Sequence, residues 1–467
     1  MSLDPDDFDG FRAEAHRMLD ALLDDLASLR ERPLWRDPAP AYAALAEPLP
    51  RKGQPMAALR AEVAAHLLPY AGGNRHPGFM GWVQGAGTAQ GMVGEMIAAA
   101  MNMNVGGRHH VGIALERQTS AWMREVMGYP ATAHGLFTTG ASQANFVAVL
   151  IARHKALGLA RRQGVGAARL TGYTSREVHG CVARAFDMAG IGADALRRVA
   201  TGGDFRVDLA ALRAAIRADR AAGLAPFLLV GSAGTVNTGA VDDLDALADL
   251  AAEEGLHYHI DGALGAGALL SPRLRPRFKG LERSDSLAFD FHKWMHVPYD
   301  AGFLLTRDGA AQRAAFASDA AYLTRAAAGL AAGEDWPCDY GPDLSRGARA
   351  LKTWFTLKSL GANALAAAIE ANCALAEHLA ARVDAEPELE RLAPVGLNIV
   401  VFRYRHAEPD RVNHAIVEAL HLEGRVAPSL TLIGGRAAIR AALVNHRTET
   451  QDIDALIGGV LAAGRRL

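Results

Sequence analysis

Apolar residues recur along this chain with periods that change from one region to the next. From residue 5 to 34 they return at every third or fourth position, which predicts an amphipathic helix. Five prolines between residues 33 and 50 overlap its end, and such a stretch favours an extended arm over a compact element. We therefore expect residues 1–84 to form a helical segment followed by an arm.

The middle of the chain, residues 85–354, alternates short apolar runs with helical periodicity. The runs typical of strands are 227–232, 256–260, 286–289 and 302–306, and clear helical segments include 142–157 and 241–254. Strands separated by helical crossovers indicate a mostly parallel sheet with helices on both faces. This region is therefore expected to form one large α/β domain.

The pattern changes again after about residue 355. A long alanine-rich helix comes first, then an apolar strand-like run at 397–403, and then a helix–strand–helix ending. We expect residues 355–467 to form a separate, smaller α+β domain.

Composition narrows the class of protein. Among 467 residues, 49 Lys and Arg are balanced by 51 Asp and Glu, so no strong field attracts nucleic acid or a membrane surface. No apolar run reaches the roughly 18 residues that a membrane span needs, and the acidic N-terminus is unlike a secretory signal. Three scattered cysteines without a CxxC spacing argue against a disulfide framework and against a metal site. The expectation is a cytoplasmic globular protein that binds neither nucleic acid nor membrane.

Lys293 is one of only six lysines in a chain that otherwise uses arginine. It follows the apolar run 286–289 and lies between His292 and Trp294. An unpaired ammonium at the end of a buried strand is costly, whereas a lysine with a lowered pKa can form a Schiff base with an aldehyde. From this segment alone, a surface lysine on a loop remains an equal alternative.

A carboxylate ends another predicted strand. Asp261 follows the run 256–260 and precedes Gly262 and Ala263, two small residues that leave room for a flat ring. Ligands of α/β enzymes bind at the carboxyl edge of the sheet, and a protonated pyridine nitrogen is one cation that a buried carboxylate can pair with. Taken alone, the segment is better explained by an Asp that caps the next helix.

Two further segments place polar groups at helix starts. Ala141 and Ser142 lead into a helical stretch, where free backbone N–H groups and a hydroxyl would bind an anion. The alternative there is an ordinary serine N-cap. Thr174 and Glu177 have the spacing of a capping box, which puts His179 in the first turn of a helix. A histidine at that position could stack on a ring or be purely structural.

Together, the anion site, the histidine, the carboxylate and the lysine follow the order found in fold-type I enzymes that use pyridoxal 5'-phosphate, which this chain resembles. The finer motifs are residues 76–79, 259–263 and 292–294 with Asp300. They are most similar to those of the group II decarboxylases, in particular aromatic-L-amino-acid decarboxylase and its bacterial relatives. The resemblance extends over nearly the whole chain. It implies an α/β, fold-type I architecture whose large domain has a mostly parallel seven-stranded sheet.

The resemblance also implies a role for each of these residues. Lys293 would hold pyridoxal phosphate as a Schiff base, and Asp261 would pair with the ring nitrogen. The other residues implied in cofactor binding are Ala141, Ser142, His179, Thr235, Ala263, Asp290, His292 and Ser345. Asp290 stands where the aromatic enzymes have an asparagine near the phosphate, so its charge has to be offset or turned away.

Members of this group are homodimers with composite sites, which implies that the N-terminal arm embraces a partner and that Ser345 and Arg346 approach from it. Tyr322, about thirty residues after the lysine, matches the tyrosine of a mobile loop that protonates the substrate carbon once carbon dioxide has left. Relatives with phenylalanine there consume oxygen and make aldehydes. Tyr322 and His179 therefore favour simple decarboxylation, although a tyrosine that merely packs on a loop is the plain alternative.

The small-molecule substrate is expected to be an amino acid, and the residues expected to shape its pocket are Asn74, Trp82, Gly85, Asn104 and Arg108. Asn74, Gly85 and Asn104 replace larger side chains of the aromatic enzymes, and Arg108 belongs to a polar cluster. An aromatic L-amino acid is the leading substrate. The alternatives are aspartate, glutamate, cysteine sulfinate or 2,4-diaminobutyrate, and then an aldehyde synthase, an aminotransferase or a non-catalytic scaffold.

Overall fold

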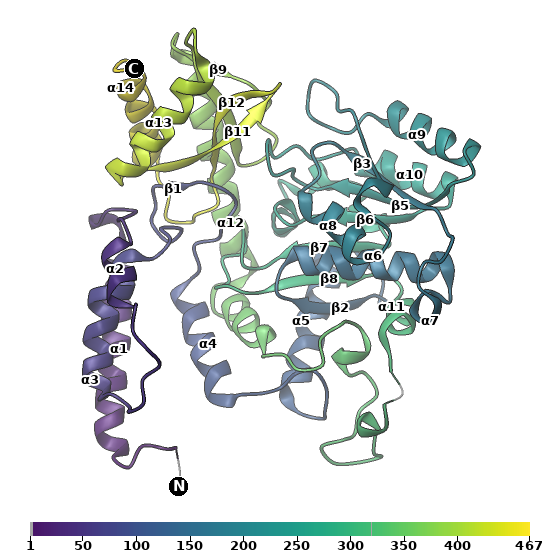
Figure 1. Ribbon diagram of the computed structural model, residues 1–467, viewed down its shortest axis with the longest axis horizontal. Helices are drawn as coiled ribbons and strands as arrows, with labels where there is room; N and C mark the ends of the chain where they lie inside the picture. The colour runs from purple at the N-terminus through teal and green to yellow at the C-terminus, as the bar shows by residue number, and fades with distance from the viewer. Residues whose placement is uncertain (1–2, 319) are drawn as a thin grey trace.

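The computed structural model describes residues 3–318 and 320–467, except for the side chain of Tyr322, and arranges them in three regions (Figure 1). The N-terminal helices stand on one side, below the small domain, and the large domain lies on the other side. The long helix α12 (Arg349–Ala385) connects the two domains.

The N-terminal region begins with α1 (Phe8–Ala27), whose first turn is capped by Asp7 through a hydrogen bond of 2.9 Å from the Gly10 N–H. This helix ends earlier than the predicted residue 34. Two short helices follow, α2 (Ala39–Ala44) and α3 (Met56–Glu62). The prediction of a wholly extended arm is wrong at α2, because Pro40 lies in its first turn, where the fixed φ of proline suits a helix.

The large domain is built on a seven-stranded sheet with the strand order β2-β8-β7-β6-β5-β3-β4. Its strands are β2 (His134–Thr138), β3 (Leu170–Ser175), β4 (Leu196–Val199), β5 (Ala225–Ser232), β6 (His257–Asp261), β7 (Ser286–Asp290) and β8 (Gly302–Thr306). Only β8 runs against its neighbours, β2 and β7, while the other pairs are parallel. The prediction of a mostly parallel sheet is confirmed.

Helices cover both faces of this sheet, as the alternation of strands and helices predicted. The helices packed against it are α5 (Val111–Met127), α6 (Ala141–Leu157), α8 (Gly180–Met188), α9 (Leu209–Ala221) and α10 (Leu244–Glu254). Helix α4 (Ala89–Met101) packs against α12, and α7 (Ala160–Gln163) and α11 (Gly309–Phe316) pack against α6. Consecutive strand residues enter different cores: Leu287 belongs to the core that contains Leu247 of α10, and Ala288 belongs to the core that contains Ala144 of α6. This alternation is the two-residue period of a strand buried on both sides.

The small domain holds a five-stranded sheet with the order β1-β11-β12-β10-β9. Its elements are β1 (Phe79–Met80), β9 (Leu389–Arg391), β10 (Ile399–Tyr404), α13 (Pro409–Glu423), β11 (Ala427–Ile433), β12 (Arg436–Ala442) and α14 (Thr450–Gly464). The predicted helix–strand–helix ending is wrong in one respect, because β11 and β12 form a hairpin. Gly434 and Gly435 make its turn with positive φ values of 59° and 78°.

Strand β1 comes from the N-terminal region but pairs in parallel with β11 of the small domain. Residues 79–80 of the N-terminal segment therefore join the sheet of the small domain, while the expected domain boundaries at residues 84 and 354 stay predictions. In the described part of the chain, helices are either too short or too polar to cross a bilayer.

Candidate active site

One cavity of about 530 Å³ lies at the carboxyl edge of the large sheet. It gathers most of the predicted site residues: Trp82, Ala141, Ser142, His179, Thr235, Asp261, Ala263, Asp290, His292 and Lys293. These side chains come from the ends of β6 and β7, from the starts of α6 and α8 and from the loops beside them. Parallel strands bring such distant segments together at one edge, where α/β enzymes bind their ligands.

Lys293 lies in the loop after β7, within ion-pair distance of a carboxylate. Its Nζ atom is 2.9 Å from Oδ2 of Asp290, and its side chain is 22% exposed. Burial lowers the pKa of Lys293, but the ion pair with Asp290 and the charge of Asp261 outweigh burial and raise it above the ordinary value. The alternative of a surface lysine is therefore wrong, since this ammonium is held by buried acids.

Asp261 ends β6, one strand away from Asp290 on β7. Its carboxylate accepts a hydrogen bond of 3.1 Å from the N–H of Ala263. Burial raises the pKa of Asp261 above its ordinary value, and the charge of Lys293 offsets only part of this effect. A cationic ring nitrogen is the kind of partner that keeps such a carboxylate ionised, so the residue fits the role implied for it.

Helix α6 begins at the cavity, and the first N–H of this helix points to a carboxylate. Gly140 occupies the N-cap position, so the alternative of a serine N-cap at Ser142 is wrong. The N–H of Ala141 donates a 2.7 Å hydrogen bond to Oδ1 of Asp290. A Cβ atom on Gly302 would lie 2.3 Å from Gly140, so only glycine lets β8 pass behind this helix start. The turn fits a phosphate group, and a carboxylate already contacts it.

His179 lies at the cavity through a different local structure from the one predicted. Thr174 is buried within β3, which continues to Ser175, and no capping box forms. The reason is that β3 pairs with β4 through Ser175, which delays the helix. His179 itself is the N-cap of α8, and its Nδ1 accepts a 3.2 Å hydrogen bond from the N–H of Cys181. The exposed ring lines the cavity and can stack on a flat ligand.

Thr235 and Ala263 complete the wall on the side of Asp261. The hydroxyl of Thr235 accepts a 3.1 Å hydrogen bond from the N–H of Ala240, which fixes the side chain within its own turn. Ala263 is half-buried and small, which leaves space for a ring beside Asp261.

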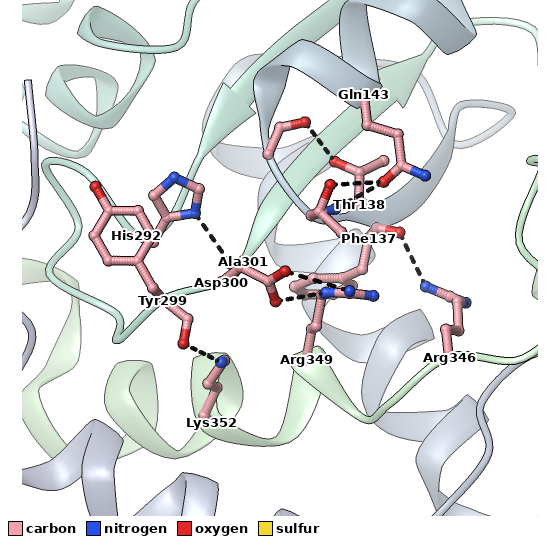
Figure 2. Close-up of polar contacts among 12 residues, drawn as sticks. Phe137, Thr138, Gln143, His292, Tyr299, Asp300, Ala301, Arg346, Arg349 and Lys352 are labelled. Carbon is pink, nitrogen blue, oxygen red and sulfur yellow. Dashed lines mark hydrogen bonds and ion pairs between the residues drawn. The ribbon is translucent and has the colours of Figure 1, made fainter. Parts of the chain in front are cut away.

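His292 lies near the start of the loop after β7 and contacts two residues near the end of that loop (Figure 2). Its Nδ1 accepts a 3.0 Å hydrogen bond from the N–H of Ala301, and its ring lies 4.3 Å from that of Tyr299. Burial lowers the pKa of His292, although Asp290 opposes this effect. The loop is tied to α12, because Lys352 donates to the Tyr299 carbonyl at 3.0 Å and Arg349 pairs with Asp300 at 2.8 Å.

Tyr299 and Arg440 are among the residues of the cavity wall that were missed by the sequence reasoning. Tyr299 is half-exposed and lines the cavity beside Lys293, and its only signal was an aromatic residue shortly after the lysine motif. Arg440, on β12, is 4% exposed, and its Nη1 donates to Ser429 Oγ at 2.9 Å. No carboxylate of the described residues pairs with it, and its Nε and Nη2 have no hydrogen-bond partner there. Burial lowers the pKa of Arg440 to about 10.

Trp82 also lines this cavity, and the centre of its ring lies 6.1 Å from that of Phe79 and 6.5 Å from that of His421. It is 54% exposed and has a φ of 48°, a left-handed conformation that costs a non-glycine residue free energy and often marks functional sites. The backbone N–H of Trp82 donates to Ser429 Oγ at 3.2 Å, and the same hydroxyl accepts a hydrogen bond from Arg440.

Several predicted residues do not line the cavity that holds Lys293. Asn74 donates to the Gly85 carbonyl at 2.8 Å, and both residues line a second cavity of about 250 Å³ beside α1. Asn104 accepts hydrogen bonds from the N–H groups of Gly106 and Arg346. The guanidinium of Arg108 lies 4.7 Å from the centre of the Trp336 ring.

Residues 345–346 were expected to approach the site of a partner subunit, but only the first of them is exposed. Ser345 is exposed, and its role stays a prediction. Arg346 is buried, pairs with Glu116 and donates to the Phe137 carbonyl at 3.0 Å (Figure 2). Its guanidinium is used inside its own chain, and the expectation that Arg346 approaches a partner's site stays a prediction. Tyr322 lies in the turn Ala321–Leu323, and its side chain is outside the described part of the structure.

Comparison with known proteins agrees with this site. The chain is 30% identical to an aromatic-L-amino-acid decarboxylase of Bacillus atrophaeus over 95% of this chain and 93% of that one. It is also 30% identical to an L-2,4-diaminobutyrate decarboxylase of Rhizobium meliloti, over 90% and 84%. The solved structure of Oryza sativa TDC with PLP and tryptamine superposes with a TM-score of 0.92 at 25% identity, covering 100% of this chain and 99% of that one.

The family model described as the pyridoxal-dependent decarboxylase conserved domain matches residues 38–405. That match spans the large domain, the lysine, both carboxylates and the anion site. The chain therefore belongs to the pyridoxal-dependent decarboxylase family and is a carboxy-lyase that uses pyridoxal phosphate.

Proposed function

We propose that this enzyme decarboxylates an aromatic L-amino acid to carbon dioxide and the corresponding amine. The observation that carries the aromatic choice is Trp82, a half-exposed aromatic residue that lines the lysine cavity. A flat apolar ring offers a substrate ring a stacking partner. The similarity to the Bacillus enzyme and to the tryptamine-bound rice structure supports the same choice.

The residues of the chain divide the work of the reaction among them. Pyridoxal phosphate, when bound, supplies an electron sink for the bond that breaks as carbon dioxide leaves. Lys293 would hold the cofactor covalently, and Asp261 would keep its ring nitrogen protonated. His179 and Ala263 would fix the plane of the ring, which orients the breaking bond.

The α carbon of the substrate gains a proton once carbon dioxide has left. The phenol of Tyr322 is our proposed donor, in line with the loop position that it shares with relatives. Tyr299 lines the cavity with its own phenol, whose pKa is raised by burial, so this group stays protonated at neutral pH. Replacing Tyr322 by phenylalanine distinguishes the two candidate proton donors, Tyr322 and Tyr299.

A second candidate substrate is an acidic amino acid, and Arg440 is the observation that favours it. A buried guanidinium with two nitrogens free of partners among the described residues is suited to a carboxylate. That carboxylate belongs either to the side chain of an acidic substrate or to the α carbon of any amino acid. Arg108, the residue first considered for this role, is instead stacked on Trp336.

We also propose that the enzyme works in the cytoplasm as a homodimer with a composite site. Helix α4 exposes Val93, Met96, Ile97 and Met101, an apolar group of the kind that subunit interfaces cover. Light scattering on the purified protein gives the mass directly, and a monomer at working concentration contradicts the composite site.

The substrate is tested with purified protein and added pyridoxal phosphate. Carbon dioxide and amine are measured from tyrosine, tryptophan and dopa, and from aspartate, glutamate, cysteine sulfinate and 2,4-diaminobutyrate. We expect amine from the aromatic group and none in Lys293→Ala. Amine only from the acidic group moves the specificity to Arg440, and amine only from the diamino acid leaves both readings wrong.

A further inference from the structure

Asp290 occupies the position where an anion of the cofactor is expected. Its carboxylate is 2% exposed and accepts the 2.7 Å hydrogen bond from the N–H of Ala141, at the start of α6. The same carboxylate lies 2.9 Å from Nζ of Lys293. One acid thus contacts both the helix start that would receive the phosphate and the amine that would bond the cofactor.

Each of these contacts favours the ionised carboxylate. The first turn of a helix stabilises an anion through its free N–H groups and its dipole. A charge-assisted hydrogen bond to an ammonium adds to this stabilisation. The carboxylate therefore gains from the helix start what a phosphate would gain, and two anions at one turn repel each other.

The other charged and titratable groups around Asp290 do not offset a second anion. His292 places Nε2 at 3.6 Å from Oδ1, but burial lowers the pKa of this imidazole and disfavours its cation. Asp261 is a further acid, and Tyr299 is a phenol. Lys293 is the remaining cation, and it has to lose its proton before its nitrogen can bond the cofactor aldehyde with loss of water.

We propose that Asp290 competes with the cofactor phosphate for the start of α6: it accepts the Ala141 N–H that the phosphate would need, and it gives up this hydrogen bond when the phosphate binds. Asp290 therefore weakens phosphate binding. An uncharged residue there binds the phosphate group more tightly. The proposal rests on the cofactor of the family and not on the choice of substrate.

The test compares two ligands that differ only in phosphate. Cofactor-free wild type and Asp290→Asn are titrated with pyridoxal phosphate and with pyridoxal, and dissociation constants are taken from the absorbance of the bound ligand. Any change in the reactivity of Lys293 affects both ligands alike, so the ratio of the two constants isolates the phosphate. We expect Asp290→Asn to raise the preference for pyridoxal phosphate over pyridoxal by about tenfold or more, which corresponds to about 1.4 kcal/mol.

Two further variants make the result decisive. Asp261→Asn removes a charge from the neighbouring strand end, and we expect it to weaken both ligands while it leaves their ratio within about twofold. Asp290→Ser provides a second uncharged residue in case the amide variant does not fold. An unchanged or lowered ratio in the Asp290 variants overturns the proposal. No amino acid substrate enters the assay, so a wrong substrate assignment leaves this result intact.

Discussion

The cavity has two ends that are built in different ways. At the cofactor end, Asp261 and Asp290 end adjacent strands of one sheet, and Lys293, just after the second strand, forms an ion pair with Asp290 within the same chain. At the proposed substrate end, Trp82 precedes the large sheet and Arg440 comes from β12. Asn74 and Arg108, the residues first expected there, lie outside the cavity and contact the Gly85 carbonyl and the Trp336 ring. The chemistry of the cofactor is thus fixed by sheet topology, whereas side-chain specificity depends on loops and on the small domain.

The largest expected effect breaks the cofactor end. Lys293→Ala removes the covalent attachment, and we expect kcat to fall by about 10³-fold or more, as for other covalent catalytic residues. Amine release under saturating pyridoxal phosphate measures the loss. Lys279→Ala is the matched control, since this lysine is 78% exposed and pairs only with Asp245 among the described acids. Comparable loss in both variants contradicts a specific role for Lys293.

The next effect concerns the loop of Tyr322. Tyr322→Phe removes the proposed proton donor, and we expect amine formation to fall by about 10²-fold, within the usual range of general acid catalysis. Cofactor binding, followed by absorbance, should not change. Peroxide and aldehyde in place of amine would show that the tyrosine decides between two reactions. Full amine formation would assign the proton to Tyr299, and Tyr299→Phe then becomes the informative variant.

A smaller effect is expected at the substrate wall. Arg440→Met removes a charged hydrogen bond to a substrate carboxylate, which is worth about 1.5–3 kcal/mol, so KM should rise by about tenfold or more. The melting temperature should hold or rise, because a buried guanidinium without a carboxylate partner costs stability. Arg403→Met is the control: its Nε donates to the Ala437 carbonyl at 2.8 Å, and its loss should lower the melting temperature. A large loss of stability in Arg440→Met would mean that this arginine is structural.

The smallest effect is expected at Arg108, which lies outside the cavity that holds Lys293. Arg108→Ala removes the guanidinium from the Trp336 ring, a contact worth about 0.5–2 kcal/mol. We expect a slightly lower melting temperature and less than about a threefold change in kcat/KM. A tenfold loss of kcat/KM, with normal folding, would place Arg108 in the substrate site of an assembled dimer.

Residues whose role follows from their own strand were predictable from the sequence. Asp261 and Lys293 each follow a short apolar run, and the carboxyl edge of a sheet is where such runs end. The capping box at Thr174 was wrong because pairing with β4 kept that residue in a strand, a long-range effect that local spacing does not contain. Arg440 was missed for a similar reason, since only the folded small domain brings β12 to the cavity. The contact of Asp290 with Ala141 likewise joins segments far apart in sequence.

The hydroxyl of Ser429 on β11 joins two residues of the cavity wall. It accepts hydrogen bonds from the backbone N–H of Trp82 and from the guanidinium of Arg440, so the backbone at Trp82 and the side chain of Arg440 share one anchor. The strand β1, just before Trp82, pairs with that same strand. If the small domain moves, Trp82 and Arg440 therefore move together, while the residues that would hold the cofactor stay with the large domain. Substrate selection and cofactor chemistry can then change independently, because the residues proposed for them belong to different parts of the chain.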